Sequence, residues 1–409
     1  MRRLIFWIGA SMSKQIKSAL SLITVLLITF CLQGCLRHSD TALREKANEL
    51  SHKFIIVDTH QDVPERLQAG AEDISVRTER GNFDYPRAIQ GGLNAVFMAA
   101  YVPPRYEQRG GAQAYAENGI NLVKGLAQKY SGKFVIAKSP ADVRQQFSSS
   151  KISCVLCIEN GSALEGDVNN VRYFYDLGAR YITLCHSAAN IICDSSFDAT
   201  RRWHGLSPFG KQVIEEMNRT GMMIDVSHVS DEAFYQVLEL SKSPVIASHS
   251  SCRFFTPGFE RNLSDDMIKA LAKKGGVIQI NFGSMFINTE ANKGFSIGRQ
   301  RTPADSNAAG GRGSTAATQT QRIYGDVFEV ADHIDHVVKL AGIDYVGFGS
   351  DFDGVGDALP VGLKDVSCYP NLIYELLKRG YSDSDIKKIC GDNILRVWSQ
   401  IQKAAQKSN

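Results

Sequence analysis

The chain contains eight short, continuous apolar runs, with helical or loop segments between successive runs. The runs cover residues 54–60, 93–102, 153–160, 179–186, 222–228, 244–250, 276–282 and 345–352. Apolar runs without alternation are typical of strands that are buried on both faces, as in parallel sheets. Eight such strands alternating with helices predict an α/β fold, a single (β/α)8 barrel of the TIM type, in preference to an open doubly wound sheet.

Polar residues at the carboxyl ends of these runs indicate a functional site. In chain order the ends carry His60 with Asp62, Tyr101, Glu159, His186, His228, His249, Asn281 and Asp351. One histidine at a strand end is most often an ordinary hydrogen-bonded residue. Six of the eight ends, however, present a histidine or a carboxylate, the groups that bind divalent metals and transfer protons. Because strand ends converge at one mouth of a barrel, the sequence predicts a metal site there.

The spacing of these residues predicts how two cations could be held. His60 and Asp62 are two positions apart, so strand alternation places both side chains on one side, where they can share a cation. His228 and His249 end the two strands of a strand–helix–strand unit and are expected to hold a second cation. Glu159 is the expected bridge, because each of its two oxygens can bind one metal. Such a pair of cations would acidify a bridging water to hydroxide near neutral pH.

Eight sequence blocks, in register over residues 48–398, carry a specific resemblance. They are THQDVP, CIENGSALEGD, LCHSAAN, IDVSHVS, IASHSSCR, ERNLSDDMIKALAKKGG, HIDHVVKLAGIDYVGFGSDFDGV and GYSDSDIKKICGDNILRVW. This set resembles the membrane dipeptidase (renal dipeptidase) family of zinc metallopeptidases. The resemblance implies a distorted barrel of the amidohydrolase type, two Zn²⁺ per chain, and hydrolysis of dipeptides, including those with a D-residue at the carboxyl side.

The same resemblance implies a role for each site residue. His60 and Asp62 would bind one zinc, His228 and His249 the other, and Glu159 both. The remaining implied roles belong to His186, which polarises the scissile carbonyl, Arg261, which receives the substrate carboxylate, and Asp351, which carries the proton from the bridging hydroxide to the leaving amine. Tyr101 is expected to line the substrate pocket.

The chain departs from the family pattern at several positions. Gln61 and Asn160 stand where the family commonly has Asn and Gly, and neither change removes a ligand. A one-residue insertion before Arg261 leaves Arg253 as a rival carboxylate binder. Gly283 stands where an aromatic residue often follows strand seven, which affects pocket shape.

Two other functions are compatible with parts of this pattern. Another barrel metallohydrolase, such as a lactonase or amidohydrolase, would share the ligands without a carboxylate-binding arginine. A non-catalytic surface lipoprotein could use the barrel only to bind a ligand, but this alternative predicts a broken ligand set, and all five ligands are present.

The N-terminus has the pattern of an export signal. Arg2, Arg3, Lys14 and Lys17 precede the apolar run SALSLITVLLITF, which is short for a membrane span. The LQGC that follows resembles a lipoprotein cleavage box, so residues 1–34 are predicted to be a signal peptide, starting at Met1 or Met12, and Cys35 to be acylated. The predicted location is a bacterial envelope, facing the periplasm or the cell surface, with a membrane anchor. An uncleaved N-terminal anchor would give the same topology.

The charge balance excludes a nucleic-acid partner. The formal net charge is +3, but the signal carries four positive and no negative residues, so without it the charge is about −1. No lysine or arginine cluster interleaves with aromatic residues. The expected partners are a dipeptide substrate and the membrane, and a homodimer is compatible with the sequence.

The rest of the chain completes the expected organisation. Residues 36–50 are predicted to form a tether and first helix, residues 51–400 a single catalytic domain, and residues 401–409 a tail. A Gly/Ala/Ser/Thr-rich segment at 299–322 predicts a flexible insertion. Outside residues 1–35, seven cysteines remain, and those within apolar runs, including Cys154 and Cys157, are expected to be buried thiols. His204, His333 and His336 are expected to be surface or supporting residues.

Overall fold

A computed structural model describes residues 40–70, 72–300 and 323–408. The predicted signal peptide, Cys35 and most of the predicted insertion at 299–322 lie outside the described residues. Within them, no helix has both the length and the apolar character needed to cross a bilayer.

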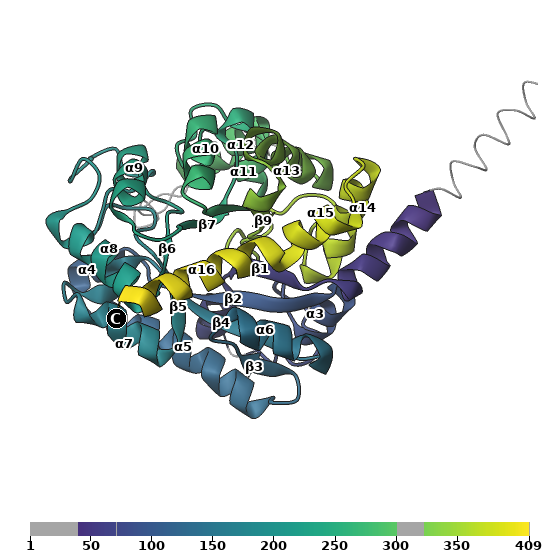
Figure 1. Ribbon diagram of the computed structural model, residues 1–409, viewed down its shortest axis with the longest axis horizontal. Helices are drawn as coiled ribbons and strands as arrows, with labels where there is room; N and C mark the ends of the chain where they lie inside the picture. The colour runs from purple at the N-terminus through teal and green to yellow at the C-terminus, as the bar shows by residue number, and fades with distance from the viewer. Residues whose placement is uncertain (1–39, 71, 301–322, 409) are drawn as a thin grey trace, which may run out of the picture.

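Eight parallel strands form a closed barrel, which confirms the predicted fold (Figure 1). The ring runs through β2, β1, β9, β8, β7, β6, β5 and β4, and pairing of β2 with β4 closes it. Its strands are β1 (Ile56–Gln61), β2 (Leu93–Tyr101), β4 (Ile152–Glu159), β5 (Ala179–Thr183), β6 (Met223–Asp225), β7 (Ile246–Ser250), β8 (Val277–Ile280) and β9 (Val346–Phe348). Every carboxyl end therefore faces the same mouth.

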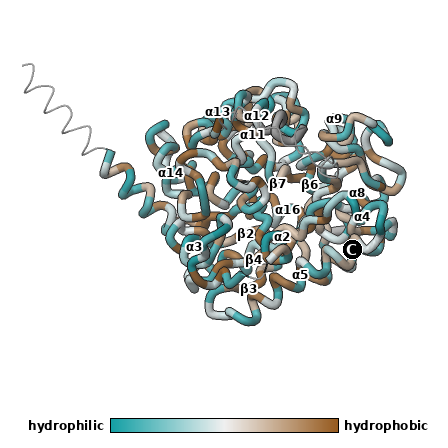
Figure 2. The backbone as a smooth tube through the Cα atoms, turned by 180° about the vertical axis from the view of Figure 1, so that it is seen from behind, coloured by the Kyte–Doolittle hydropathy of each residue, from teal (hydrophilic) through white to brown (hydrophobic). Residues whose placement is uncertain are grey.

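A short ninth strand, β3 (Phe134–Ile136), lies outside this ring and was not predicted. It pairs in parallel with the first residues of β4, through Phe134 with Ile152 and Ile136 with Cys154. Because β2 occupies one edge of β4, β3 and β5 share the other edge. Three residues of apolar sequence are too short to distinguish a strand from a loop. Figure 2 shows β2, β3 and β4 from behind, with α5 beside them.

Helices surround the barrel and occupy most of the connections. They are α2 (Val63–Ala69), α3 (Tyr85–Gly91), α4 (Arg105–Arg109), α5 (Ala112–Lys129), α6 (Pro140–Gln146), α7 (Asn169–Leu177), α8 (Pro208–Thr220), α9 (Asp231–Leu240), α10 (Asp265–Lys273), α11 (Ser284–Ile287), α12 (Thr289–Gln300), α13 (Val327–Ala341), α14 (Tyr369–Lys378), α15 (Asp383–Lys387) and α16 (Asn393–Ser408). Side-chain caps begin several of them, since Ser230 accepts from Ala233 N and Ser264 from Met267 N.

Three predicted boundaries differ from the structure. A helix covers residues 40–53, so the first helix predicted within residues 36–50 continues past residue 50. Helix α12 includes residues 299 and 300, which belong to the predicted insertion. Helix α16 continues to Ser408, and most of the predicted tail is therefore helix. Helix ends are weakly specified when polar residues continue a helical pattern.

Apolar side chains fill the barrel interior and seal its amino end. Inward residues such as Phe97 and Tyr181 pack in one cluster with Trp398 from α16. The Phe97 and Trp398 rings are 5.6 Å apart, and α16 crosses the barrel in Figure 1. Along β4, Cys157 faces this interior cluster whereas Cys154 faces the outer one. The two thiols point to opposite faces of the strand, so they cannot bind one metal together.

Candidate metal centre

The five predicted ligands and Asp351 lie together at the carboxyl mouth of the barrel. His60 belongs to β1, Glu159 ends β4 and His249 belongs to β7, while Asp62 and His228 follow β1 and β6. All of these side chains are buried. Three sets of potential ligand atoms lie within 4.8 Å of one another: His60 with Glu159 and His249, Glu159 with His186 and His228, and His60 with Asp62 and Asp351. Two neighbouring cations could occupy this arrangement.

Glu159 occupies the centre of the cluster. Its Oε1 lies 3.0 Å from Nε2 of His228 and 3.3 Å from Nε2 of His249. Its Oε2 lies 3.7 Å from Nε2 of His60. Burial raises the pKa of Glu159 well above its usual value, and the charge of His60 opposes this effect. The two carboxylate oxygens therefore face different imidazoles, as a bridging ligand requires.

A hydrogen bond directs His60 into the site. Its Nδ1 lies 2.7 Å from the Tyr181 hydroxyl, whereas its Nε2 is buried without a hydrogen-bond partner and lies 3.4 Å from Asp62 Oδ2. Burial opposes a charge on His60, but Glu159 and Asp62 outweigh it and raise its pKa to about 10. A buried imidazole nitrogen aimed at two carboxylates fits a metal ligand whose second nitrogen is held by a neighbour.

His228 and His249 form the second half of the site. Their Nε2 atoms are only 2.9 Å apart, and burial lowers the pKa of both well below the usual value. Nδ1 of His249 lies 2.7 Å from Ser248 Oγ, which in turn donates to Asp225 at 2.6 Å. Because Ser248 donates its proton to Asp225, neutral His249 must donate from Nδ1 to Ser248, and its Nε2 keeps a lone pair. The Nε2 atoms of the two imidazoles therefore converge on one point, where a shared cation would fit.

Asp351 follows β9 and completes the group with His60 and Asp62. Asn281 donates a hydrogen bond of 2.7 Å to its Oδ2. Burial and the charge of Asp62 raise the pKa of Asp351 to about 7. A carboxylate that titrates near neutral pH can both accept and release a proton.

Four residues at this mouth have a strained backbone. His228, Asp351, Asp353 and Asn160 all have positive φ, between 62° and 83°. Residues other than glycine rarely adopt this conformation, and it persists mainly where the surrounding structure holds functional groups in place. Gly354 is required for a different reason, since a Cβ there would lie 2.1 Å from Asp62 Oδ2 and 2.3 Å from Asp351 Oδ1.

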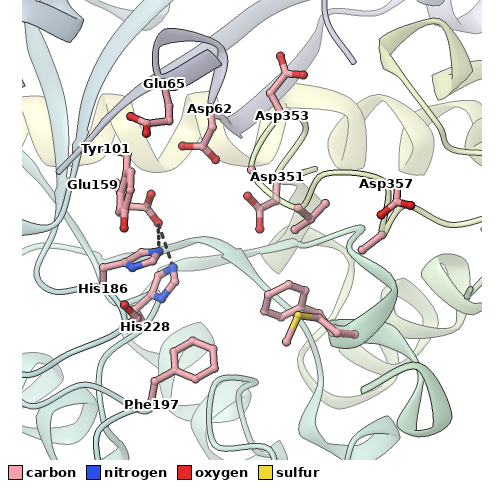
Figure 3. A pocket seen from close by; sticks show the side chains of 16 residues that line it. Asp62, Glu65, Tyr101, Glu159, His186, Phe197, His228, Asp351, Asp353 and Asp357 are labelled. Carbon is pink, nitrogen blue, oxygen red and sulfur yellow. Dashed lines mark ion pairs between the residues drawn. The ribbon is translucent and has the colours of Figure 1, made fainter. Parts of the chain in front are cut away.

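Asp62, Glu159, His228 and Asp351 line an open cavity of about 430 Å³ (Figure 3). His186 and Tyr101 form part of its wall, with ring centroids 4.6 Å apart. His186 Nε2 lies 3.7 Å from Glu159 Oε1, and its ring lies against that of His228. His186 is therefore positioned to donate a hydrogen bond to a group bound beside Glu159.

The two candidate arginines have different environments. Arg253 forms a two-pronged ion pair with Asp231, with N–O distances of 2.7 and 2.5 Å. Arg261 is buried behind His249 and does not reach the cavity wall. It donates to the His249 carbonyl and to Ser250 Oγ, and its Nε has no hydrogen-bond partner. Burial lowers the pKa of Arg261 to about 10. Arg253 is thus committed to a structural pair, whereas Arg261 keeps an unused donor.

The residues that depart from the expected pattern point away from the ligands or shape the cavity. Gln61 donates to Asp58, and Asn160 donates to the Val102 carbonyl. Gly283 lies where a Cβ would be 2.8 Å from the ring of Phe286, so its lack of a side chain allows Phe286 to line the cavity.

Sequence reasoning missed the residues that orient the ligands, namely Tyr181, Asp225, Ser248, Asn281 as a partner of Asp351, and Gly354. Asp225 offered a signal, since a carboxylate inside an apolar run must have buried partners; it accepts from Thr183 Oγ1 at 2.6 Å. His333, expected at the surface or in support, is fully buried, and its Nδ1 accepts from Cys252 N.

Comparisons with known proteins agree with this geometry. A family profile described as membrane dipeptidase (peptidase family M19) matches residues 44–409. Dipeptidase 3 of Mus musculus is 31% identical over 379 residues, which cover 90% of this chain and 69% of the mouse protein. The structure of the probable dipeptidase PvdM from Pseudomonas aeruginosa superposes with a TM-score of 0.77 at 28% identity, over 89% of this chain and 99% of that one. A metallo peptidase from Rhodobacter sphaeroides, liganded with a phosphinate mimic of L-Ala-D-Ala, has the same fold (TM-score 0.71, 23% identity, 85% of this chain and 99% of that one).

Proposed function

The chain belongs to the membrane dipeptidase family and is a metallo-dipeptidase, and from this premise we propose that it uses two zinc ions to hydrolyse dipeptides, including those with a D-residue at the carboxyl side. His60 and Asp62 would hold one zinc, His228 and His249 the other, and Glu159 both. The ligand set contains only imidazole and carboxylate groups, which suits zinc. The relative that carries an L-Ala-D-Ala mimic supports the stereochemical part of the proposal.

The position of Glu159 is the observation that supports two metals most directly. Its Oε1 faces His228 and His249, while its Oε2 faces His60. A single cation would use one of these two groups and leave the other buried and unpartnered, which is costly.

Each remaining site residue has a proposed part in the reaction. When bound, the zinc ions would supply an activated water and polarise the scissile carbonyl. His186 donates to the carbonyl oxygen as negative charge develops on it. Asp351 accepts the proton of the attacking water and delivers it to the leaving amine. Tyr101 packs beside His186 and restricts where the substrate can lie.

Recognition of the substrate carboxylate is assigned to Arg261. Arg261 does not line the cavity, so it would attract the carboxylate through its charge, which acts on Asp351 and Glu159 at the metal centre. Within the described residues it forms no ion pair, whereas Arg253 is already paired with Asp231. A carboxylate bound near Arg261 at a fixed distance from the metals would limit the substrate to two residues. A lactone or amidine lacks this carboxylate, so neither is the preferred substrate.

The test combines metal analysis with a dipeptide panel. Purified protein lacking residues 1–35 is expected to contain about two zinc ions per chain, to lose activity on chelation and to regain it with zinc. Glu159→Gln is expected to lose zinc and turnover together, because it removes the charge that both ions share. Arg261→Ala is expected to keep zinc but to raise KM for dipeptides. Full activity of Glu159→Gln would show that the bridging assignment is wrong.

We also propose that the enzyme is exported and anchored to a bacterial envelope membrane through acylated Cys35. The order of basic residues, apolar run and LQGC supports this proposal.

A further inference from the structure

Three carboxylates that line the cavity have no part in the proposed reaction. Six acidic residues line the cavity, and its described lining contains no lysine or arginine. They are Asp62, Glu65, Glu159, Asp351, Asp353 and Asp357. Three of these belong to the metal centre, and Asp353 is paired with Arg66 at 3.2 Å. Asp357 lies 3.3 Å from the Tyr324 hydroxyl, near Lys364. Glu65 therefore requires a separate explanation.

Glu65 is held in place without being neutralised. It lies in the first turn of α2, three residues after Asp62, and its Oε2 accepts from the Tyr115 hydroxyl at 3.1 Å. In the described part of the chain it forms no ion pair, and exposed Arg105 acts on it only from a distance. Burial raises the pKa of Glu65, and the Tyr115 hydrogen bond opposes this rise. A cation bound in the cavity would favour its ionised form.

The place of Glu65 in the barrel indicates which part of a dipeptide it faces. Its charge acts on Tyr101, at the end of β2, and Figure 3 shows the two side chains on the same side of the cavity. In the eight-strand ring, β2 and β7 are four strands apart and so lie on opposite sides. Arg261, assigned to the substrate carboxylate, lies beside β7. The amino-side residue of the dipeptide therefore faces Glu65.

The amino-side residue of the dipeptide could offer two cationic groups to Glu65, its α-ammonium or a basic side chain, and their distances from the scissile bond distinguish them. Its α-ammonium is two bonds from the scissile carbonyl carbon and must lie near the metal-centre carboxylates. Glu65 is one helical turn farther away, since side chains three residues apart on a helix are about 5–6 Å apart at Cβ. A lysine or arginine side chain can span that gap.

We propose that Glu65 is a specificity-determining residue that binds a basic side chain on the amino-side residue of the dipeptide. This inference rests on the proposed dipeptidase function and on the orientation set by Arg261. The preferred substrates are then dipeptides that begin with lysine or arginine.

The experiment measures kcat/KM for Lys-Ala and Met-Ala, whose first side chains have similar length but different charge. We expect the wild type to prefer Lys-Ala. Glu65→Gln keeps an acceptor for Tyr115 but removes the charge, so kcat/KM for Lys-Ala should fall about fivefold to tenfold while that for Met-Ala changes less than about twofold. Glu65→Lys should shift the preference toward Glu-Ala.

The neutral substrate separates the two proposals. Hydrolysis of Met-Ala by the wild type tests the dipeptidase function alone. Equal losses on Lys-Ala and Met-Ala in Glu65→Gln, or no preference for Lys-Ala in the wild type, would overturn the role of Glu65. Glu239→Gln, an exposed change on α9, is the matched control and should leave both values unchanged.

Discussion

At the scale of single residues, this site depends on side chains that orient the candidate ligands and Asp351 through hydrogen bonds. Tyr181 holds one nitrogen of His60, Ser248 holds one of His249, and Asn281 holds Asp351. Each of these contacts fixes the direction of a lone pair or a carboxylate before a metal or substrate arrives. Such preparation reduces the reorganisation needed during the reaction.

The pH profile tests the role of Asp351. Only its ionised form can accept a proton, so kcat/KM is expected to fall as the pH drops through its pKa, which bound cations would lower below the value of about 7. Asn281→Ala removes a hydrogen bond that favours the ionised form, and the fall should move to higher pH. Asp351→Asn should lower kcat by about 10²–10⁴ while zinc content is retained.

Asp266→Asn provides the control for this set, because Asp266 is exposed on α10 and pairs there with Lys269. An unchanged acid limb in Asn281→Ala would mean that Asp351 does not govern the profile.

At the scale of elements, α16 closes the amino end of the barrel, while the candidate metal centre lies at the carboxyl end. Its inward residues pack with the interior side chains of β1, β2, β4 and neighbouring strands. This placement lets the strand ends at the opposite mouth carry polar and strained residues, since the apolar end stabilises the barrel. The same division explains why the catalytic mouth of such barrels can vary.

Trp398→Ala tests this division between stability and activity. Trp398 is fully buried against Phe97, so the change should lower the free energy of unfolding by about 3–5 kcal/mol in urea titrations. The kcat/KM of the folded variant should remain near that of the wild type. Lys403→Ala, on the exposed face of α16, should change stability by less than about 0.5 kcal/mol. A loss of activity in folded Trp398→Ala would show that the two ends are coupled.

At the scale of the whole molecule, the proposed membrane anchor and the catalytic mouth of the barrel have separate functions. The first described helix, over residues 40–53, extends from the barrel and would connect it to the membrane side (Figure 1). Acyl chains on one cysteine would then keep the enzyme near its membrane without a part in the chemistry.

Cell fractionation tests the anchor. Cys35→Ser is expected to release active protein from the membrane fraction, because acyl chains can no longer form, and mass spectrometry of the wild type should find a lipidated N-terminus. Continued membrane attachment of Cys35→Ser would instead favour an uncleaved apolar anchor.

The sequence by itself determined the barrel and the identity of the polar residues at its strand ends. Continuous apolar runs and their terminal residues are local properties, and periodicity reveals them. The way these polar residues come together depends on closure of the barrel. β2 pairs with β4 although more than fifty residues separate their paired positions, and this closure brings Glu159 between His60 and His228. The tertiary structure also decided that Arg253 is paired with Asp231, and that Glu65 faces the cavity with no ion-pair partner in the described part of the chain. Ion pairs and burial depend on neighbours that are distant in the sequence.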